Sequence, residues 1–508
     1  MIANSSGPRD GMWTAGTIFL KSSDACVPLG LAALSFIGAQ SLVAVPFGLL
    51  KKATSLAPFE NASIAMALGL ATFAACLMAL RSRRPIAQAG RRRLSNITLQ
   101  VVVVAVLVGL LARVLVIAFA VVTPASDAMV YMKLAERLAS DEPYIIAGRF
   151  AYWPVGYPFL LSIWFRVFEP SIHVVHAFNV ALYAATCLGI LSLAKAWGHE
   201  QAGRLATILF ACWPDLVVLT TWPSKELVAI ALLPWAVTLC FAEPPSYGLR
   251  TVCRICAGLI VGCLVLVQPS FLLLIPILPL ATSLAKRSNF GSTIREVTLV
   301  TVVAVLTVAP WTLRNYRVLN AFVPVATNGG EVFYRANNPL ADGGYVKRGE
   351  VDLWVLPELE ASRMGLLLAK EWITANPHKF IGLTFQKQLL FLEDDSIGVY
   401  EVFRRGNTAT PIAEKTYFLV KLACIAYWYV LWVLFCGALY VTLRSGQWRR
   451  MSFVFAAVPF IFLYLIHSIF ESGPRYHQPA SALLVFVMAA TLLTATSVFE
   501  PVMPTSPP

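Results

Sequence analysis

Apolar runs of about the length needed to cross a lipid bilayer recur along nearly the whole chain. A bilayer core requires roughly 20 apolar residues per helix. Runs near that length cover residues 26–50, 62–80, 97–122, 172–195, 203–222, 225–243, 297–313, 416–443, 451–470 and 479–498. The longer run 252–284 has Gln268-Pro269-Ser270 at its middle, which predicts two helices. The pattern therefore predicts an all-α polytopic integral membrane protein with about 12 transmembrane helices.

The distribution of charge indicates an orientation in the membrane and not a nucleic-acid partner. Hydrophobic residues make up 58% of the chain and the net charge is +13, a composition too apolar for a soluble protein. Six arginines crowd the short segment 81–93, whereas the long loop 314–415 holds as many acidic as basic residues. Because Lys and Arg in short loops mark the cytoplasmic side, we expect segments 123–154, 314–415 and 471–478 on the outer side.

This map divides the chain into four regions. Residues 1–96 are predicted to hold two transmembrane helices and a basic cytoplasmic loop, and no cleavable signal peptide is expected there. Residues 97–313 form a transmembrane catalytic module with a first outer loop at 123–154. The large outer loop follows at 314–415, and residues 416–508 form the last helices with an outer hairpin at 471–478. The short apolar piece 155–168 is predicted to be a juxtamembrane or re-entrant helix.

Asp127 stands at the outer end of run 97–122, where the chain becomes polar. From Asp127 to Ser140 the pattern is that of an amphipathic helix lying in the membrane interface. Tyr131 follows Asp127 by one turn. The carboxylate at this position is either an N-cap, with Ser126 competing for that function, or a group that meets a substrate at the membrane surface. The aromatic cluster Phe150, Tyr152 and Trp153 is typical of an interfacial belt.

Other polar residues are predicted at the same outer surface. Lys225 and Glu226 begin a membrane helix, where the carboxylate either caps that helix or lines a cavity shared with Asp127. Asn328 and Asn338 lie in Gly- and Asn-rich turns of the large loop, which are typical of ordinary turns as well as of binding loops.

Two further groups lie near the carboxyl half of the chain. Lys387 belongs to a predicted amphipathic helix, 366–391, which precedes the acidic run Glu393-Asp394-Asp395. That run favours a solvated loop over a metal site, and the cysteines of the apolar spans complete no zinc pattern. Arg475 and Tyr476 lie in the outer hairpin. Arg475 is either an interfacial anchor or a bidentate ligand for a phosphate.

These pieces together resemble the GT-C class of polytopic glycosyltransferases, which use polyprenyl-phosphate sugars. The likeness is to bacterial relatives of protein O-mannosyltransferases and lipid A aminoarabinose transferases, and it spans about residues 97–480. The matching pieces are Arg113, Asp127 with Tyr131 and Ala135, Pro154 to Pro158, Glu226, Pro310 to Tyr316, Asn328-Gly329-Gly330, Asn338-Pro339 and Arg475-Tyr476. Two departures are the apolar runs 26–50 and 62–80 before this core, and the segment Ser126-Asp127-Ala128, where relatives often carry a second acid beside the aspartate.

The resemblance implies a GT-C-like fold and an inverting transfer of a sugar to an acceptor hydroxyl. Asp127 would be the general base, and Arg475 would stabilise the departing phosphate, with Lys387 as a second candidate. Glu226 would orient sugar or acceptor, Asn328 and Asn338 would contact polar groups, and Tyr131, Lys225 and Tyr476 would complete the binding site. A divalent metal is possible but not indicated, because the second acid of the first loop is absent.

The expected partners are a polyprenyl-phosphate sugar donor, a lipid, glycan or protein acceptor, and membrane lipids, with no nucleic acid. The expected location is a bacterial inner membrane with the active site on the extracytoplasmic face. A polysaccharide polymerase or ligase using a lipid-linked glycan, a transporter of lipid-linked sugars and a non-enzymatic scaffold remain alternatives. Transporters generally place their charges near the midplane, often with inverted repeats, and no repeat is visible here. The sugar, the prenyl chain, the acceptor and the oligomeric state do not follow from the sequence.

Overall fold

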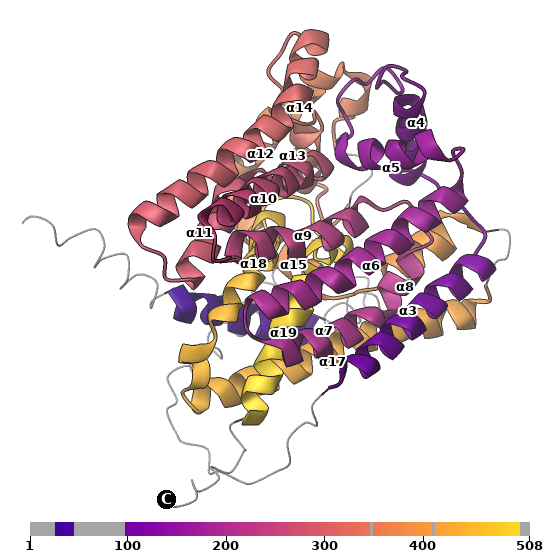
Figure 1. Cartoon of the computed structure of the whole chain (residues 1–508). Helices are drawn as coiled ribbons and strands as arrows, with labels where there is room; N and C mark the ends of the chain where they lie inside the picture. The colour runs from indigo at the N-terminus through magenta and orange to yellow at the C-terminus, as the bar shows by residue number, and fades with distance from the viewer. Residues whose placement is uncertain (1–25, 45–96, 346–348, 409–411, 498–508) are drawn as a thin grey trace, which may run out of the picture.

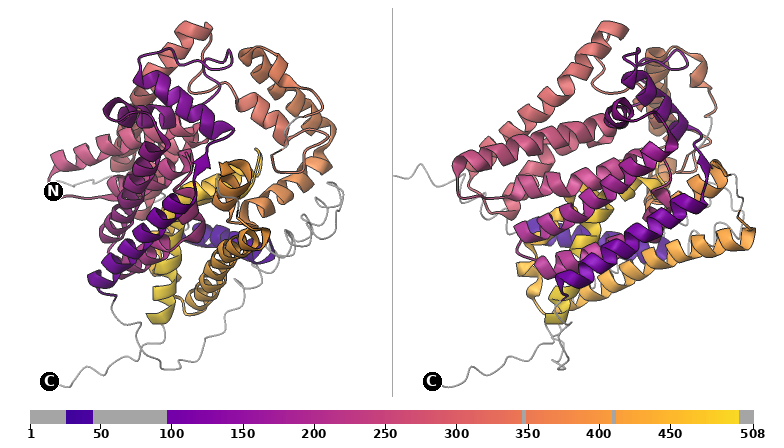
Figure 2. Two further views of the ribbon diagram at one scale, coloured as in Figure 1. Left: turned by 90° about the vertical axis from the view of Figure 1, so that its right-hand side faces the viewer. Right: turned by 45° about the vertical axis from the view of Figure 1, so that its right-hand side comes forward.

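The computed structural model describes residues 26–44, 97–345, 349–408 and 412–497. Long helices lie side by side, and shorter helices of the large loop cover one end of them (Figures 1 and 2). The α-helices are an N-terminal helix Cys26–Ala44, α3 Leu99–Phe119, α4 Asp127–Ala139, α5 Gly156–Val167, α6 Ile172–Ala196, α7 Glu200–Ala211, α8 Pro214–Leu219, α9 Lys225–Phe241, α10 Tyr247–Val267, α11 Leu274–Ala285, α12 Phe290–Leu319, α13 Gly329–Ala336, α14 Glu358–Ala375, α15 Pro377–Leu392, α16 Ile397–Tyr400, α17 Glu414–Arg444, α18 Val458–His467 and α19 Ser481–Ser497. The predicted all-α class is confirmed.

Seven helical segments of the described chain are long and apolar enough to cross a membrane, and these support an integral membrane protein. They are Cys26–Ala44, Leu99–Phe119, Ile172–Ala196, Tyr247–Val267, Phe290–Leu319, Glu414–Arg444 and Pro474–Ser497. The predicted number of about 12 is not confirmed. The predicted span 62–80 lies outside the described residues, and other predicted spans form shorter helices such as α9, α11 and α18.

Prolines interrupt two segments that were predicted to be continuous. The predicted span 203–222 is divided into α7 and α8, and Pro214 begins the second helix. The predicted helix 366–391 is likewise two helices, α14 and α15, separated at Asn376 and Pro377. Proline lacks the amide hydrogen that a helix interior needs but fits the first turn, so each of these residues begins a new helix.

Two other local predictions agree with the structure. The amphipathic helix expected at 127–140 is α4, and the short helix expected at 155–168, juxtamembrane or re-entrant, is α5. With 12 residues, α5 is about 18 Å long, which is shorter than a bilayer core of about 30 Å. It buries Tyr157, Leu161 and Phe165 and exposes apolar side chains on its other face, as expected at a membrane surface.

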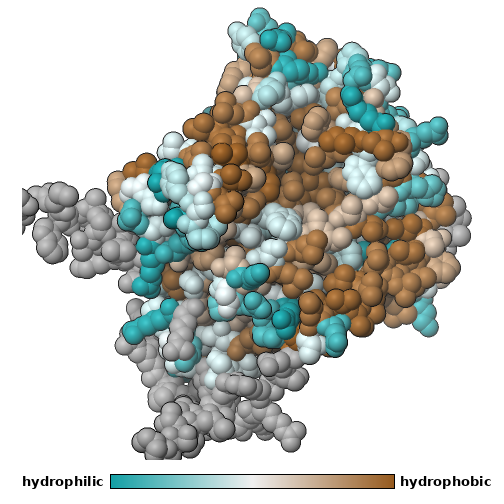
Figure 3. Space-filling model, in the orientation of Figure 1, coloured by the Kyte–Doolittle hydropathy of each residue, from teal (hydrophilic) through white to brown (hydrophobic). Residues whose placement is uncertain are grey.

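Helix α3 presents apolar side chains outward along its length. Val104 is 60% exposed and Leu107 is 57% exposed, with Val103 and Leu111 beside them. Apolar surface of this kind covers broad parts of the molecule, including the region of α3 (Figure 3). An exposed apolar face of this size is costly in water and favourable in lipid, which supports membrane insertion of this helix.

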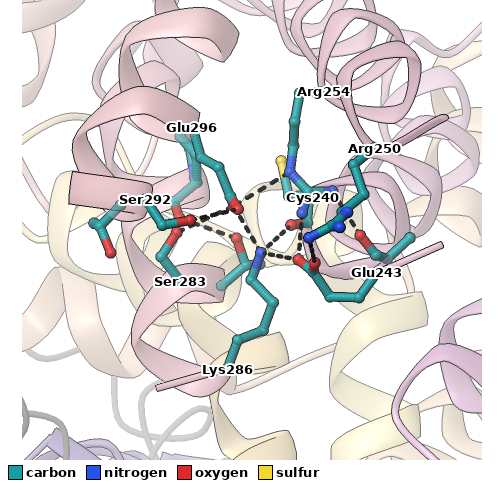
Figure 4. A network of polar contacts seen from close by, with 12 residues as sticks. Cys240, Glu243, Arg250, Arg254, Ser283, Lys286, Ser292 and Glu296 are labelled. Carbon is teal, nitrogen blue, oxygen red and sulfur yellow. Dashed lines mark hydrogen bonds and ion pairs between the residues drawn. The ribbon is translucent and has the colours of Figure 1, made fainter. Parts of the chain in front are cut away.

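A network of ion pairs ties helix ends together at the carboxyl end of α9 (Figure 4). Lys286 Nζ lies 2.6 Å from Glu296 Oε2 and 2.8 Å from Glu243 Oε1, and Arg254 contacts the same two carboxylates. Lys225 begins α9 and Phe241 ends it, so this network is separated by about 25 Å from the opposite end of the helix. The polar cavity described below lies at that opposite end.

A two-stranded antiparallel pair lies next to this cavity. Strand β1 (Val122–Thr123) follows α3, and strand β2 (Asn407–Thr408) follows a π-helical turn at Glu401–Arg405. Val122 pairs with Thr408, and Thr123 pairs with Asn407. The sequence did not predict these strands. The pairing holds the start of the first loop against the end of the large loop.

Candidate functional site

A cavity of about 760 Å³ lies where the loop helices cover the membrane helices. Its wall comes from segments far apart in the sequence: the start of α4, residues 152–153, the start of α9, α13, the turn before α14, residues 397–405 and the hairpin 471–476. A small recess of about 30 Å³ shares Asp127, Tyr131 and Arg475 with this cavity and adds Glu226. Of the predicted site residues, Asp127, Tyr131, Lys225, Asn328, Arg475 and Tyr476 line the main cavity.

Asp127 is the first residue of α4 and faces the cavity. The N-cap position belongs to Ser126, whose φ of 56° is left-handed and whose side chain makes no capping hydrogen bond. Trp153 Nε1 donates a hydrogen bond of 3.1 Å to Asp127 Oδ1. No residue in the described part of the chain donates a hydrogen bond to Oδ2. One carboxylate oxygen is therefore oriented by an indole, and the other is available to a molecule in the cavity.

Glu226 and Arg475 form an ion pair across 249 residues of sequence. Glu226 Oε1 lies 3.0 Å from Arg475 Nη2 and 3.3 Å from its Nε. Ser224 Oγ donates a 2.8 Å hydrogen bond to the other oxygen, Glu226 Oε2. The carboxylate is buried and its two oxygens are occupied, so Glu226 holds the guanidinium in place at the edge of the cavity.

Lys225 differs from its neighbours because its ammonium is unpaired within the described part of the chain. It is half-buried, lines the cavity and stands at the first position of α9, where backbone N–H groups point outward. A cation without a carboxylate partner beside a helix N-terminus attracts anions. This end of the cavity is therefore suited to bind a phosphate group.

A second chain of polar contacts forms the wall toward the large loop. Arg335 donates to Glu331 Oε1 at 3.1 Å and to Glu471 Oε2 at 3.3 Å. Tyr152 Oη also donates to Glu331, at 2.9 Å, and Tyr476 Oη donates to Glu471 at 2.5 Å. The two carboxylates are thus held by partners from the first loop and the hairpin.

Helix α13 reaches this wall because its backbone lies directly against α14. A Cβ atom on Gly330 would lie 1.8 Å from the carbonyl oxygen of Ser362, so no larger residue fits without moving α14. Asn328 precedes the helix and lines the cavity. The Asn-Gly-Gly segment, predicted as a turn or binding loop, is the start of a packed helix whose asparagine faces the cavity.

Asn338 and Lys387, both predicted to bind substrate, are not among the residues that line the cavity. The buried Asn338 amide donates to the carbonyls of Tyr334 and Arg335 and accepts from the N–H of Leu340, so it closes the turn after α13. Lys387 is fully buried behind the hairpin. Its Nζ donates to Asn337 Oδ1 and to the carbonyl of Ile469, each at 2.8 Å. The sequence does not show which way either side chain faces, because neither the turn that holds Asn338 nor the helix that holds Lys387 carries that information.

The aromatic residues of the first loop also have a different location from the one predicted. Tyr152 and Trp153 were expected in an interfacial belt, but both line the cavity and pack against each other with ring centroids 4.7 Å apart. Trp354 of the large loop packs against Tyr152, with centroids 5.2 Å apart. The sequence contains no pattern that separates a cavity wall from an interfacial belt at these positions.

Glu401 and Arg405 line the cavity and were not predicted as site residues. They belong to the π-helical turn, and Arg405 Nη1 lies 2.9 Å from Glu401 Oε1. Burial raises the pKa of Glu401 above its ordinary value. Short π-helical segments occur often at functional sites, but the sequence shows no spacing that identifies this one.

Two buried charged residues, Arg113 of α3 and Asp215 of α8, have partners outside the cavity. Arg113 Nη1 donates to the carbonyls of Gly109 and Ala211, and its guanidinium lies 3.8 Å from the Tyr183 ring centroid. Asp215 accepts from the backbone N–H groups of Gly398 and Val399. Across the described residues, no group of three or more His, Cys, Asp or Glu side chains is arranged to hold a metal ion.

Solved structures with a similar arrangement of helices are membrane transferases. The oligosaccharyltransferase of Archaeoglobus fulgidus, in complex with zinc and sulfate, is 15% identical with a TM-score of 0.46, and the match covers 80% of this chain and 54% of that one. The same organism's oligosaccharyltransferase AglB, in complex with an inhibitory peptide and a dolichol-phosphate, is 14% identical with a TM-score of 0.43, over 79% of this chain and 50% of that one. ArnT from Cupriavidus metallidurans, bound to undecaprenyl phosphate, is 12% identical with a TM-score of 0.39, over 78% and 77% of the two chains.

These neighbours are GT-C glycosyltransferases, the class that the sequence motifs resemble. This chain spans about half the length of the archaeal oligosaccharyltransferase. No protein-family model matches the chain, and no curated protein matches it in sequence. At these identities and TM-scores, the similarity assigns neither a reaction nor a residue role, which must come from the cavity itself.

Proposed function

We propose that this protein is a membrane glycosyltransferase of the GT-C type. It moves a sugar from a polyprenyl-phosphate donor to the hydroxyl of an acceptor. One observation carries the proposal: the same cavity is lined by an oriented carboxylate, Asp127, and by a cation that forms no ion pair in the described residues, Lys225. A base and an anion-binding group within one cavity are what a displacement at an anomeric carbon requires.

The reaction is a single displacement. The acceptor oxygen attacks the anomeric carbon and its proton passes to Asp127 Oδ2. The bond between the anomeric carbon and the phosphate oxygen breaks, and polyprenyl phosphate leaves with that electron pair. A single base on one face of the sugar implies inversion at the anomeric carbon. General-base assistance of this kind contributes roughly 10²–10⁴ to the rate.

Lys225 and Arg475 have different parts in binding the phosphate. Arg475 is already paired with Glu226, which offsets much of its charge, whereas the Lys225 ammonium carries no such partner in the described structure. We therefore assign Lys225 as the main contact of the phosphate and Arg475 as a second contact whose position Glu226 maintains. Tyr131, Asn328 and Tyr476 line the same cavity and complete the binding site.

The reaction is proposed to take place on the extracytoplasmic face of a bacterial inner membrane. The basic segment 81–93 and the cations Arg250, Arg254 and Lys286 would lie on the cytoplasmic side. Figure 4 shows the ion-pair network that contains the last three, and this network lies near the carboxyl end of α9, whereas the cavity lies at the start of that helix. This supports an outer location for the site, where a donor lipid and a lipid, glycan or protein acceptor can meet.

The test is turnover by purified protein in nanodiscs with a panel of polyprenyl-phosphate sugars. Wild-type protein is expected to release polyprenyl phosphate when an acceptor is present, and Asp127→Asn is expected to lower release at least about tenfold without loss of folding. Asp141→Asn, an exposed change outside the cavity, is the matched control. Normal turnover by Asp127→Asn would exclude it as the base.

The same assay separates the alternatives. Transfer that requires a lipid-linked glycan of several sugars would identify a polymerase or ligase instead. Movement of the intact donor across the membrane without release of polyprenyl phosphate would identify a transporter.

A further inference from the structure

Lys387 is buried against neutral oxygens and lies outside the cavity. It is 0% exposed, and its Nζ donates 2.8 Å hydrogen bonds to Asn337 Oδ1 and to the carbonyl oxygen of Ile469. No ion pair involves it in the described residues. Burial of a lysine amine costs free energy. An apolar residue would avoid this cost but could not form the hydrogen bonds by which Lys387 joins two separate segments, so these bonds indicate a structural role.

The two neighbours of Lys387 also connect α15 to other segments. Gln386 Nε2 donates to the carbonyl of Asp342 at 2.5 Å, and Gln388 Nε2 donates to Ser468 Oγ at 3.2 Å. The N-terminal helix joins this arrangement, because Gln40 Nε2 donates to Gln388 Oε1 at 3.1 Å. Three successive residues of α15 therefore bond to the large loop, the end of α18 and the N-terminal helix.

These contacts converge on the hairpin that walls the cavity. Ser472 Oγ donates to the carbonyl of Lys387 at 2.7 Å, and Ser472 N donates to the carbonyl of Gly343 at 3.1 Å. Asn337 Nδ2 donates to the carbonyl of Ile469, the same oxygen that Lys387 contacts. The hairpin then continues into Arg475, which lines the cavity.

We propose that Lys387 is a positioning residue, which acts on the reaction through the hairpin that carries Arg475 and does not touch the donor. The assignment rests on the proposed function for its catalytic part. By joining Asn337 at the end of α13 to Ile469 at the end of α18, Lys387 fixes the start of the hairpin. The backbone carbonyl of Lys387 accepts a hydrogen bond from Ser472 and so fixes the middle of the hairpin. Arg475 then reaches Glu226 in the orientation that the cavity requires.

The structural part is tested without any donor by hydrogen–deuterium exchange of the purified protein. Lys387→Met is expected to speed exchange of backbone amides in residues 468–476 by at least about threefold. Lys379→Met, an exposed change on the same helix, is the matched control and is expected to leave that exchange unchanged. Equal exchange in wild type and Lys387→Met would overturn the proposal, whether or not the protein is a glycosyltransferase.

The catalytic part is tested by a double-mutant cycle with Arg475→Ala, measured as release of polyprenyl phosphate. If Lys387 acts through Arg475, Lys387→Met lowers turnover at least about tenfold in the wild-type background and less than about threefold in the Arg475→Ala background. A loss of folded protein would instead lower turnover by the same factor in the wild-type and Arg475→Ala backgrounds. Equal losses in the two backgrounds would therefore overturn the proposal.

Lys387→Gln keeps a hydrogen-bond donor and is expected to recover part of the turnover that Lys387→Met loses. If Lys387→Met does not fold, the exchange measurement and the cycle are repeated with Lys387→Gln. Because glutamine keeps a donor, changes in the same direction but smaller than those given for Lys387→Met are expected, and no change in either measurement would overturn the proposal. Absence of polyprenyl phosphate release by wild-type protein with every donor would contradict the proposed function. The exchange measurement would still decide whether Lys387 holds the hairpin.

Discussion

The indole of Trp153 donates a 3.1 Å hydrogen bond to the carboxylate of Asp127, although the two residues belong to different segments of the first loop. Trp153 itself is held in place, because its carbonyl accepts a 3.0 Å hydrogen bond from Tyr144 Oη. Tyr144 thus holds Trp153 in place, and Trp153 orients the carboxylate of Asp127. For a base, orientation of this kind limits the rotation that would turn its free oxygen away from the substrate.

Trp153→Phe is expected to lower turnover roughly tenfold. Phenylalanine keeps an aromatic ring at this position but cannot donate a hydrogen bond to the Asp127 carboxylate. Hydrogen bonds to charged groups contribute about 1.5–3 kcal/mol. The measurement is release of polyprenyl phosphate at saturating donor. Trp372→Phe, a change in α14 outside the cavity, is the control. Full activity in Trp153→Phe would mean that Asp127 needs no help from the indole.

Lys225→Met is expected to raise the KM for the donor about tenfold with a smaller change in kcat. The reason is that an unpaired cation contacts the phosphate in the ground state as well as in the transition state. Donor titrations give both constants. Lys133→Met removes an exposed lysine of α4 and serves as the control. Unchanged KM in Lys225→Met would remove this residue from the phosphate site.

Glu226→Gln is expected to bind polyprenyl phosphate more tightly and to turn over more slowly. Removal of the carboxylate charge leaves Arg475 free to attract the phosphate, yet the product then leaves less readily and the guanidinium is held less firmly. Isothermal titration with polyprenyl phosphate measures the affinity. Weaker binding than in wild-type protein would contradict the view that Glu226 offsets the charge of Arg475.

Asn338→Ala is expected to destabilise the protein by about 1–3 kcal/mol and to leave the KM for the donor unchanged. The amide is fully buried and bonds to backbone groups of the turn after α13, so its loss leaves those groups unpaired. Thermal unfolding in detergent measures the first effect and donor titration the second. A raised KM with normal stability would return Asn338 to the binding site.

The stability that depends on Lys387 is expected to rise with pH. Burial lowers the pKa of Lys387 from 10.5 to about 7, so between these values the unfolded chain binds more protons at this position than the folded protein. Stability linked to this group is therefore fully present above the unfolded pKa and is lost as the pH falls toward 7. Thermal unfolding of wild type and Lys387→Gln is compared at pH 7, 8 and 9. The unfolding temperature of the wild type relative to that of Lys387→Gln should increase as the pH rises. A difference in unfolding temperature that does not change with pH would contradict the lowered pKa of Lys387.

The membrane class could be predicted from the sequence because it depends on local composition. A run of apolar residues must avoid water wherever the rest of the chain lies, so runs such as 97–122 and 172–195 predicted α3 and α6 closely. The amphipathic helix beginning at Asp127 also follows from local periodicity. The lengths of inner helices were less predictable, because prolines such as Pro214 end helices that composition alone would continue.

The site was only partly predictable, because which residues meet depends on packing between distant segments. The family resemblance implied one substrate site for Asp127, Glu226 and Arg475, and all three line the same recess. The sequence contains nothing that pairs Arg475 with Glu226 and leaves Lys225 unpaired. It also could not show that Trp153 faces Asp127 or that Glu401 lies nearby. Those relationships arise when loops separated by hundreds of residues close over the helix ends.

The sequence by itself determined that this chain is a helical membrane protein with polar groups at helix ends, since apolar length and charge position act locally. Only the tertiary structure decided which of those groups face a common cavity. Lys387 shows the difference: the family resemblance implied a second phosphate-binding cation, and the structure buries it behind the hairpin with hydrogen bonds to Asn337 and Ile469. A side chain's role depends on what surrounds it in space, and that is set by contacts between segments that the local pattern does not contain.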